Sequence, residues 1–199
     1  MKQIGVTGGI GSGKSTICEI FRLLGAPVYE ADAEAKKLQD ENQDIKKGLI
    51  NLFGSFIYFE NGKLDRKKLA DFIFSNKSLL KEVNELVHPV VHAHYEHWLT
   101  VNGRAPYIIY EAAILFESGF YKNMDEIILV TAPEETRIAR VVSRDKLTYE
   151  QVKKRIQNQW PEEEKRKLAD YIIENNNSNL VIPQVVELDK RFKNNGKIR

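Results

Sequence analysis

The stretch Gly8–Ser15, GGIGSGKS, overlaps the end of the apolar run KQIGVTG at residues 2–8 and precedes a helical pattern at residues 14–25. It fits G-x-x-x-x-G-K-[ST], a pattern typical of a phosphate-binding loop between a strand and a helix. Glycines let consecutive backbone N–H groups face an anion, and the helix that begins near Lys14 adds the positive end of its dipole. The stretch therefore predicts that this segment, called the phosphate loop below, binds a nucleoside triphosphate.

The polar residues of the phosphate loop and of the next helical turn each have an expected contact. Lys14 should reach the β- and γ-phosphates, and the Ser15 hydroxyl should ligate Mg²⁺. The Thr16 hydroxyl can add a contact at the α-phosphate. We therefore expect Mg²⁺ as the cofactor and ATP bound by Gly11, Ser12, Gly13, Lys14, Ser15 and Thr16.

Charge, cysteine content and hydropathy argue against several other classes of protein. The chain has 199 residues, a formal net charge of +2 and one cysteine, Cys18. The charge is too small for a nucleic-acid coat, one cysteine forms no intramolecular disulfide, and the apolar runs are too short to span a bilayer. No secretory signal pattern opens the sequence. We expect a cytoplasmic protein without nucleic-acid or membrane partners, as a monomer or a weak homo-oligomer.

Short apolar runs that alternate with helical patterns predict an α/β fold with a parallel sheet. We expect five strands, near residues 2–8, 26–30, 106–112, 125–133 and 171–175. The second and third strands are separated by about seventy residues that look helical and charged, too many for a simple crossover. They predict an inserted helical lobe.

We expect a single domain made of three parts. The inserted helical lobe covers about residues 32–103, and a second helical segment covers about residues 135–168. The remaining parts of the chain form the core, about residues 1–31, 104–134 and 169–199.

Two motifs that mark GTPase switches do not occur in the sequence. No aspartate begins a D-x-x-G pattern, and NKSL at Asn76 lacks the aspartate that reads guanine. A small-molecule kinase fits better. Such an enzyme needs an acceptor site, a group that orients or deprotonates the acceptor hydroxyl, and cations for the transferring phosphoryl group.

Two carboxylates follow predicted strands at the sheet edge where open α/β folds bind ligands. Asp32 comes just after the second strand and could accept the proton of the acceptor hydroxyl. The alternative is that Asp32 only caps the next helix. Glu111, which ends the third strand, could hold Mg²⁺ through water or act as a second acid near the acceptor.

Three arginines, Arg137, Arg140 and Arg144, have the i, i+3, i+7 spacing of one helical face. Such a face is commonly solvated, but in a lid it could close over ATP and stabilise the transferring phosphoryl group. Both interpretations stay open from the spacing. The four histidines fall within residues 88–97 at a spacing that could bind zinc, but no cysteine accompanies them.

An ordered series of motifs resembles the dephospho-coenzyme A kinase family nearly from end to end. The series comprises GVTGGIGSGKST at 5–16, EADAEAKKL at 30–38, NGKLDRKKLADFIF at 61–74, LVHPVV at 86–91, ILFESGF at 114–120, RVVSRD at 140–145, LTYEQVKKRIQNQ at 147–159 and ADYIIEN at 169–175. The phosphate loop alone would indicate only a nucleotide-binding protein of the P-loop class. The ordered series specifies the family.

The resemblance implies a single kinase domain with a fold like that of nucleoside monophosphate kinases. It has a five-stranded parallel core, a helical substrate lobe at about residues 32–103 and a helical lid at about residues 135–168. It implies transfer of the ATP γ-phosphoryl group to the 3′-hydroxyl of dephospho-CoA. Asp32 matches the family's proposed general base. Arg140 and Arg144 match lid positions near phosphate. Leu64, Arg66 and His88 match the acceptor lobe, although His88-Pro89 could also simply begin a helix.

The chain departs from the family pattern at two positions. Glu30 stands where an aspartate is usual, and Ala113 lies where a proline is common. The alternatives are another small-molecule kinase, of nucleotide or shikimate type, or a nucleotide-gated binding module. ADP production that depends on the acceptor separates these functions.

Overall fold

A computed structural model describes residues 1–73, 76–176 and 178–194, without the side chain of residue 77. Residues 74–75 of the expected lobe, and 177 and 195–199 of the expected core, lie outside the described part. The chain divides into two compact units, Met1–Glu30 with Asn102–Arg199, and Ala31–Val101.

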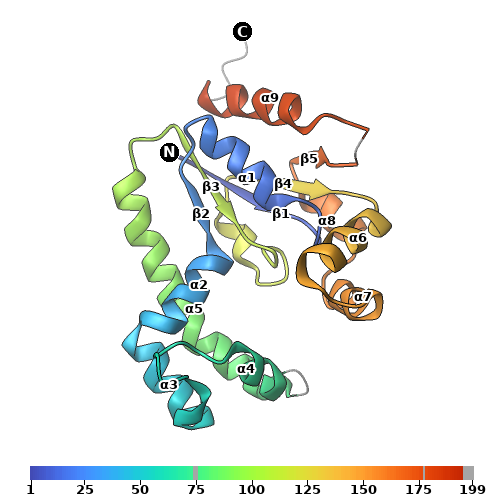
Figure 1. The fold of residues 1–199 in the computed structure, drawn as a ribbon. Helices are drawn as coiled ribbons and strands as arrows, with labels where there is room; N and C mark the ends of the chain where they lie inside the picture. The colour runs from blue at the N-terminus through green and yellow to red at the C-terminus, as the bar shows by residue number, and fades with distance from the viewer. Residues whose placement is uncertain (74–75, 177, 195–199) are drawn as a thin grey trace. The chain divides into compact units, whose positions relative to one another are not determined.

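The first unit is built on one sheet of five parallel strands, as the sequence predicts (Figure 1). Their order is β2-β3-β1-β4-β5. Val6 lies opposite both Glu111 and Ile128, which places β1 at the centre of the sheet. All carboxyl ends therefore meet at one edge. The strands are β1 (Lys2–Thr7), β2 (Val28–Glu30), β3 (Tyr107–Glu111), β4 (Glu126–Thr131) and β5 (Tyr171–Glu174).

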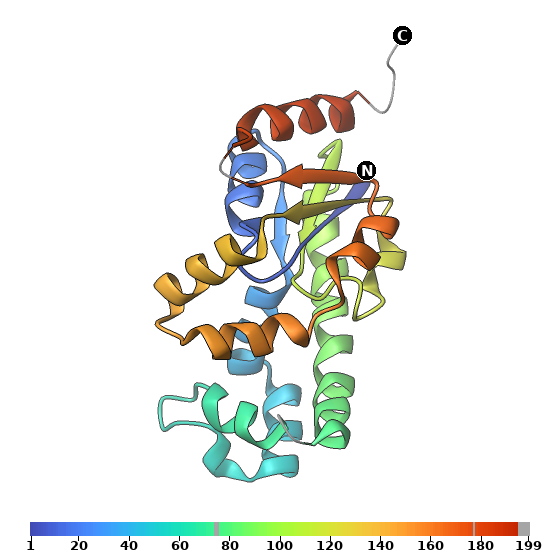
Figure 2. The same ribbon diagram turned by 90° about the vertical axis from the view of Figure 1, so that its right-hand side faces the viewer.

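One face of this sheet packs on α1 (Lys14–Leu23) and α9 (Val181–Lys193). Ile4 and Val6 on β1, and Phe21 and Phe192 on the helices, are fully buried there because alternate strand residues point to this side. The helices α9 and α8 (Glu162–Leu168) lie on opposite sides of β4 and β5 (Figure 2). This part of the sheet is thus covered by helices on both faces.

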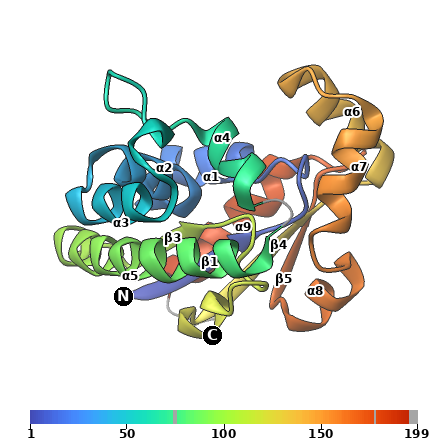
Figure 3. The same ribbon diagram turned by 90° about the horizontal axis from the view of Figure 1, so that it is seen from below.

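The segment between β4 and β5 forms two helices that lie side by side, α6 (Glu134–Asp145) and α7 (Tyr149–Gln157), followed by α8 (Figure 3). The start of α7 is set by a capping box. The Thr148 hydroxyl accepts from Gln151 N–H at 3.3 Å, and the Gln151 side chain accepts from Thr148 N–H at 2.9 Å. Ile138, Val141 and Val152 make a small buried core between α6 and α7.

The second unit is helical. Its elements are α2 (Ala31–Glu41), α3 (Gln43–Phe53), the 3₁₀ turn η1 (Ser55–Ile57), α4 (Arg66–Ile73) and most of α5 (Lys77–Asn102). Another 3₁₀ turn, η2 (Phe120–Asn123), belongs to the first unit.

The expectation that His88-Pro89 begins a helix is wrong. Pro89 lies inside α5, where it removes one i→i−4 hydrogen bond. The helix continues because Val83, Val87 and Val91 recur every four residues and are all buried in the core of the second unit. Burial on both sides of the proline compensates for the missing bond.

Candidate functional site

The phosphate loop leaves the carboxyl end of the central strand β1 and enters α1. The helix is capped by Gly13, which has a left-handed φ of 96°. Gly11 also has a positive φ, of 79°. Residues with a Cβ rarely adopt such φ angles, so glycine permits this backbone path between strand and helix.

The backbone N–H groups of the phosphate loop divide into two sets. Ile10 N–H donates to Gln159 Oε1 at 2.9 Å, and Ser12 N–H donates to Gly9 C=O at 3.0 Å. Within the described part of the chain, the N–H groups of Gly11, Gly13, Ser15 and Thr16 have no hydrogen-bond partner. The second set lies in the loop and the first turn of α1, where an anion is favoured.

The side chains expected to bind phosphate and Mg²⁺ are arranged around these amides. Lys14 Nζ donates to Gly8 C=O at 3.0 Å. Ser15 and Thr16 are exposed, and the Ser12 hydroxyl is buried with no partner among the described residues. The loop and the first turn of α1 together therefore offer one cation, two accessible hydroxyls and several N–H donors.

The three arginines of α6 do not share one environment. Arg137 is buried and donates from Nε to Ala132 C=O at 3.1 Å. Arg140 is half-buried and donates weakly to the carbonyls of Gly11 and Ser12, at 3.4 and 3.5 Å. Arg144 is exposed and pairs with both oxygens of Asp145, at 2.7 and 3.0 Å.

The solvated-face interpretation is therefore wrong for Arg137 and Arg140, because the phosphate loop and the end of β4 pack against that side of α6. It is correct for Arg144 in this structure. Asn175, which the sequence analysis missed, joins the same contact: its side-chain amide donates to Ser12 C=O at 2.8 Å, and its own C=O accepts from Arg140 at 3.2 Å. Asn175 follows β5, so the loop is held from two directions.

Glu111 ends β3 beside the phosphate loop and opposite Glu30 of β2. Burial raises the pKa of the Cys18 thiol; the carboxylates of Glu111 and Glu30 raise it further, and Lys14 opposes them. Glu111 and Lys14 thus act on the same thiol of α1. Glu30 forms an ion pair with Arg22 at 2.5 Å, which ties β2 to α1.

Asp32 is the second residue of α2, which begins at Ala31 directly after β2. The capping alternative is therefore wrong, because Asp32 lies in the first helical turn rather than before it. A carboxylate in this turn still interacts favourably with the helix dipole. The structure places Asp32 two residues beyond the carboxyl end of β2.

In the second unit, Asp40 brings two of the expected acceptor residues together. Its Oδ1 accepts from Leu64 N–H at 2.9 Å and its Oδ2 accepts from Arg66 at 2.8 Å. Arg66 also donates to Lys36 C=O at 2.7 Å. Burial alone would raise the pKa of Asp40, but the hydrogen bonds from Arg66 and Leu64 outweigh it and lower the pKa.

His88 lies on α5 and lines a surface hollow of about 650 Å³ with Lys81, Asn84 and Glu85. Desolvation lowers the pKa of the His88 imidazole, although the residue is exposed, and this favours the neutral form. The described residues contain no group of three His, Cys, Asp or Glu side chains that could hold a metal. They also contain no helix long and apolar enough to cross a membrane.

A sequence model described as dephospho-CoA kinase matches residues 2–180. The chain belongs to the dephospho-CoA kinase family. A dephospho-CoA kinase of Bacteroides fragilis is 40% identical over 186 residues, which cover 94% of this chain and 90% of that protein. The expected family is thereby confirmed.

Solved structures similar to this chain support the same family assignment. A crystal structure from Thermus thermophilus has a TM-score of 0.84 and 36% identity, covering 94% of this chain and 95% of that one. A dephospho-CoA kinase from Campylobacter jejuni has a TM-score of 0.72 and 33% identity, covering 98% and 99%. As a member of the dephospho-CoA kinase family, the chain is an ATP-dependent kinase of coenzyme A biosynthesis.

Proposed function

We propose that this kinase phosphorylates the 3′-hydroxyl of dephospho-CoA with ATP held by the phosphate loop. The observation that carries the proposal is the set of loop and helix N–H groups without a partner among the described residues, on both sides of Lys14 in the sequence. In this proposal Gly11, Ser12, Gly13, Lys14, Ser15 and Thr16 bind the triphosphate. Arg140 borders the same loop and balances the charge of the transferring group.

The groups near the phosphate loop fit Mg²⁺, which prefers oxygen ligands. Ser15 offers an exposed hydroxyl in the first turn of α1, and Glu111 offers a carboxylate at the end of the neighbouring β3. We assign Ser15 as the direct ligand and Glu111 as a contact through water. Bound there, Mg²⁺ would neutralise charge on the β- and γ-phosphates.

Asp32 is proposed as the general base. Its carboxylate takes the proton of the 3′-hydroxyl while the oxygen forms a bond to the γ-phosphorus and the bond to the bridging oxygen of ADP breaks. Its place just beyond a strand end, in the first turn of α2, supports this role.

The acceptor is assigned to residues 32–103, where Leu64, Arg66 and His88 are the proposed contacts. Arg66 is half-buried and held by Asp40, and its guanidinium supplies a positive charge for an anionic substrate. His88 would act as a neutral hydrogen-bonding group, because partial desolvation lowers its pKa. Residues 135–168 are proposed as the lid, with Arg144 leaving Asp145 when ATP is bound.

We also propose a cytoplasmic protein that acts as a monomer or a weak homo-oligomer. A single buried thiol, Cys18, suits a reducing compartment. Neither property is needed for the reaction.

A coupled ADP assay with dephospho-CoA, AMP and shikimate tests the function. We expect ADP release that depends on dephospho-CoA, with the other acceptors at the level of the acceptor-free reaction. Turnover that prefers AMP or shikimate would indicate another small-molecule kinase. Turnover that needs no acceptor would indicate a nucleotide-gated module.

A further inference from the structure

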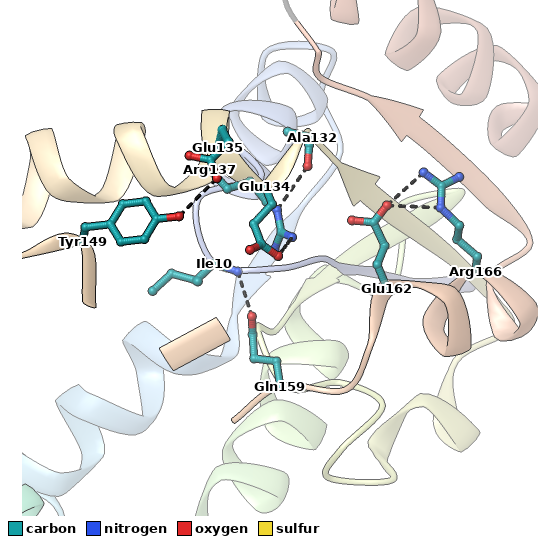
Figure 4. A network of polar contacts seen from close by, with 9 residues as sticks. All are labelled: Ile10, Ala132, Glu134, Glu135, Arg137, Tyr149, Gln159, Glu162 and Arg166. Atoms are coloured by element: carbon teal, nitrogen blue, oxygen red, sulfur yellow. Dashed lines mark hydrogen bonds and ion pairs between the residues drawn. The ribbon is translucent and has the colours of Figure 1, made fainter. Parts of the chain in front are cut away.

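The side chain of Gln159 joins three distant segments at the phosphate loop. Its Oε1 accepts from Ile10 N–H at 2.9 Å (Figure 4). Its Nε2 donates to Ala113 C=O at 3.3 Å. Ile10 belongs to the phosphate loop, Ala113 follows β3, and Gln159 follows α7. A carboxamide suits this place because its tip carries both an acceptor and a donor.

The same region holds the Ile10 side chain. It packs against the small core of Ile138, Val141 and Val152 between α6 and α7. The main chain and the side chain of Ile10 are therefore both fixed by elements between β4 and β5. Rotation of the peptide before Ile10 would break the Gln159 hydrogen bond and shift this apolar contact.

Gln159 itself rests on a rigid support. The next residue, Trp160, donates its N–H to Glu117 Oε1 at 2.9 Å, and the buried Lys165 lies 2.7 Å from the same oxygen. The Trp160 ring stacks on Phe116, with 6.5 Å between ring centroids. A residue held in this way can impose its geometry on the loop that it contacts.

We infer that Gln159 is a positioning residue of the phosphate loop. By binding the Ile10 N–H, it fixes the loop path in which the N–H groups of Gly11 and Gly13 stay available for the triphosphate. It acts through the loop backbone rather than on the reacting atoms. This inference rests on the proposed use of the loop as the ATP site.

The test compares Gln159→Met with Gln157→Met in the full chain. Methionine keeps the length and volume of the side chain but removes both hydrogen bonds, and Gln157 is the exposed last residue of α7. Three quantities are measured: amide hydrogen exchange at Ile10 by NMR, the Kd for Mg-ATP by calorimetry, and the KM for dephospho-CoA. Gln159→Glu, which keeps an acceptor for Ile10, is the second variant.

We expect Gln159→Met to speed exchange at Ile10 and to raise the Kd for Mg-ATP, each by about tenfold. The KM for dephospho-CoA and all values of Gln157→Met should stay within about twofold of wild type. Gln159→Glu should retain protection at Ile10.

Unchanged exchange and ATP affinity in folded Gln159→Met would overturn the inference. A similar rise in the Kd for Mg-ATP and in the KM for dephospho-CoA, together with a lower Tm, would also overturn it, because this result indicates general damage to the fold. If Gln159→Met misfolds, loss of Ile10 protection in folded Gln159→Glu overturns it as well. The two proposals can fail separately. If Gln159→Met raises the Kd for Mg-ATP as expected but the wild-type protein does not phosphorylate dephospho-CoA, only the acceptor assignment is contradicted.

Discussion

Lys14 Nζ donates a hydrogen bond to Gly8 C=O, at 3.0 Å, across the phosphate loop. The ammonium group is thereby held over the loop that we assign to the triphosphate. We expect Lys14→Ala to lower kcat/KM for ATP by about 10³-fold or more, because it removes a cation from the transferring phosphoryl group. Steady-state kinetics measure the loss, and the exposed Lys37→Ala serves as a control with normal activity.

Asp32 and Glu34 are the two acids in the first turn of α2. Comparing substitutions of the two therefore distinguishes a role in catalysis from a role in helix stability. Asp32→Asn should lower kcat by about 100-fold or more while the Kd for ATP stays within about twofold, because only the base is lost. Glu34→Gln also removes a carboxylate from this turn and should leave kcat unchanged. Equal kcat values for the two variants would remove Asp32 from the catalytic role.

The different surroundings of Arg140 and Arg144 predict unequal effects of substitution. Arg140→Ala should lower kcat/KM by about 100-fold, because Arg140 contacts the phosphate loop and Asn175. Arg144→Ala should cost about tenfold or less, since this exposed guanidinium is engaged by Asp145. Kinetics at several ATP concentrations rank the two, and the reverse order would refute the assignment.

The contacts of Asp40 predict that its substitution weakens binding of the acceptor only. Asp40→Asn should raise the KM for dephospho-CoA by about tenfold and leave the KM for ATP unchanged, because Asp40 orients Leu64 and Arg66. Asp44→Asn, on the exposed start of α3, is the matched control. A parallel rise in both KM values would show that Asp40 acts on the fold as a whole.

The lowered pKa of Asp40 also predicts a pH dependence of stability. A carboxyl group with a folded-state pKa below its unfolded value stabilises the fold above the unfolded pKa of about 3.9, and this contribution is lost as pH falls through the folded value. Wild type should therefore exceed Asp40→Asn in free energy of unfolding at pH 7. Urea titrations should show this difference shrinking below about pH 4.

The sheet and the phosphate loop could be predicted because their signals are local. Each buried strand is a short apolar run, and the glycine pattern sits directly between β1 and α1. The continuity of α5 could not be predicted from the proline alone, because tertiary burial of Val83, Val87 and Val91 decides it.

The residues that support the site were harder to predict because their partners are remote in sequence. Gln159 and Ile10 are 149 positions apart, and Arg66 and Asp40 are 26 apart. The spacing of the α6 arginines was visible, but the loop that packs against Arg137 and Arg140 was not. Local patterns thus indicate which residues carry the chemistry, and the tertiary fold determines which residues orient them.

Cys18 lies on α1, in the core that this helix forms with the sheet, and is 1% exposed. It is the only cysteine of the chain. Burial, then Glu111 and Glu30, raise the pKa of its thiol, so both access and ionisation restrain modification. The rate of labelling by a thiol reagent therefore reports how often this core opens, and a bound nucleotide would slow it. Cys18 can therefore report local opening of this core without an introduced label site.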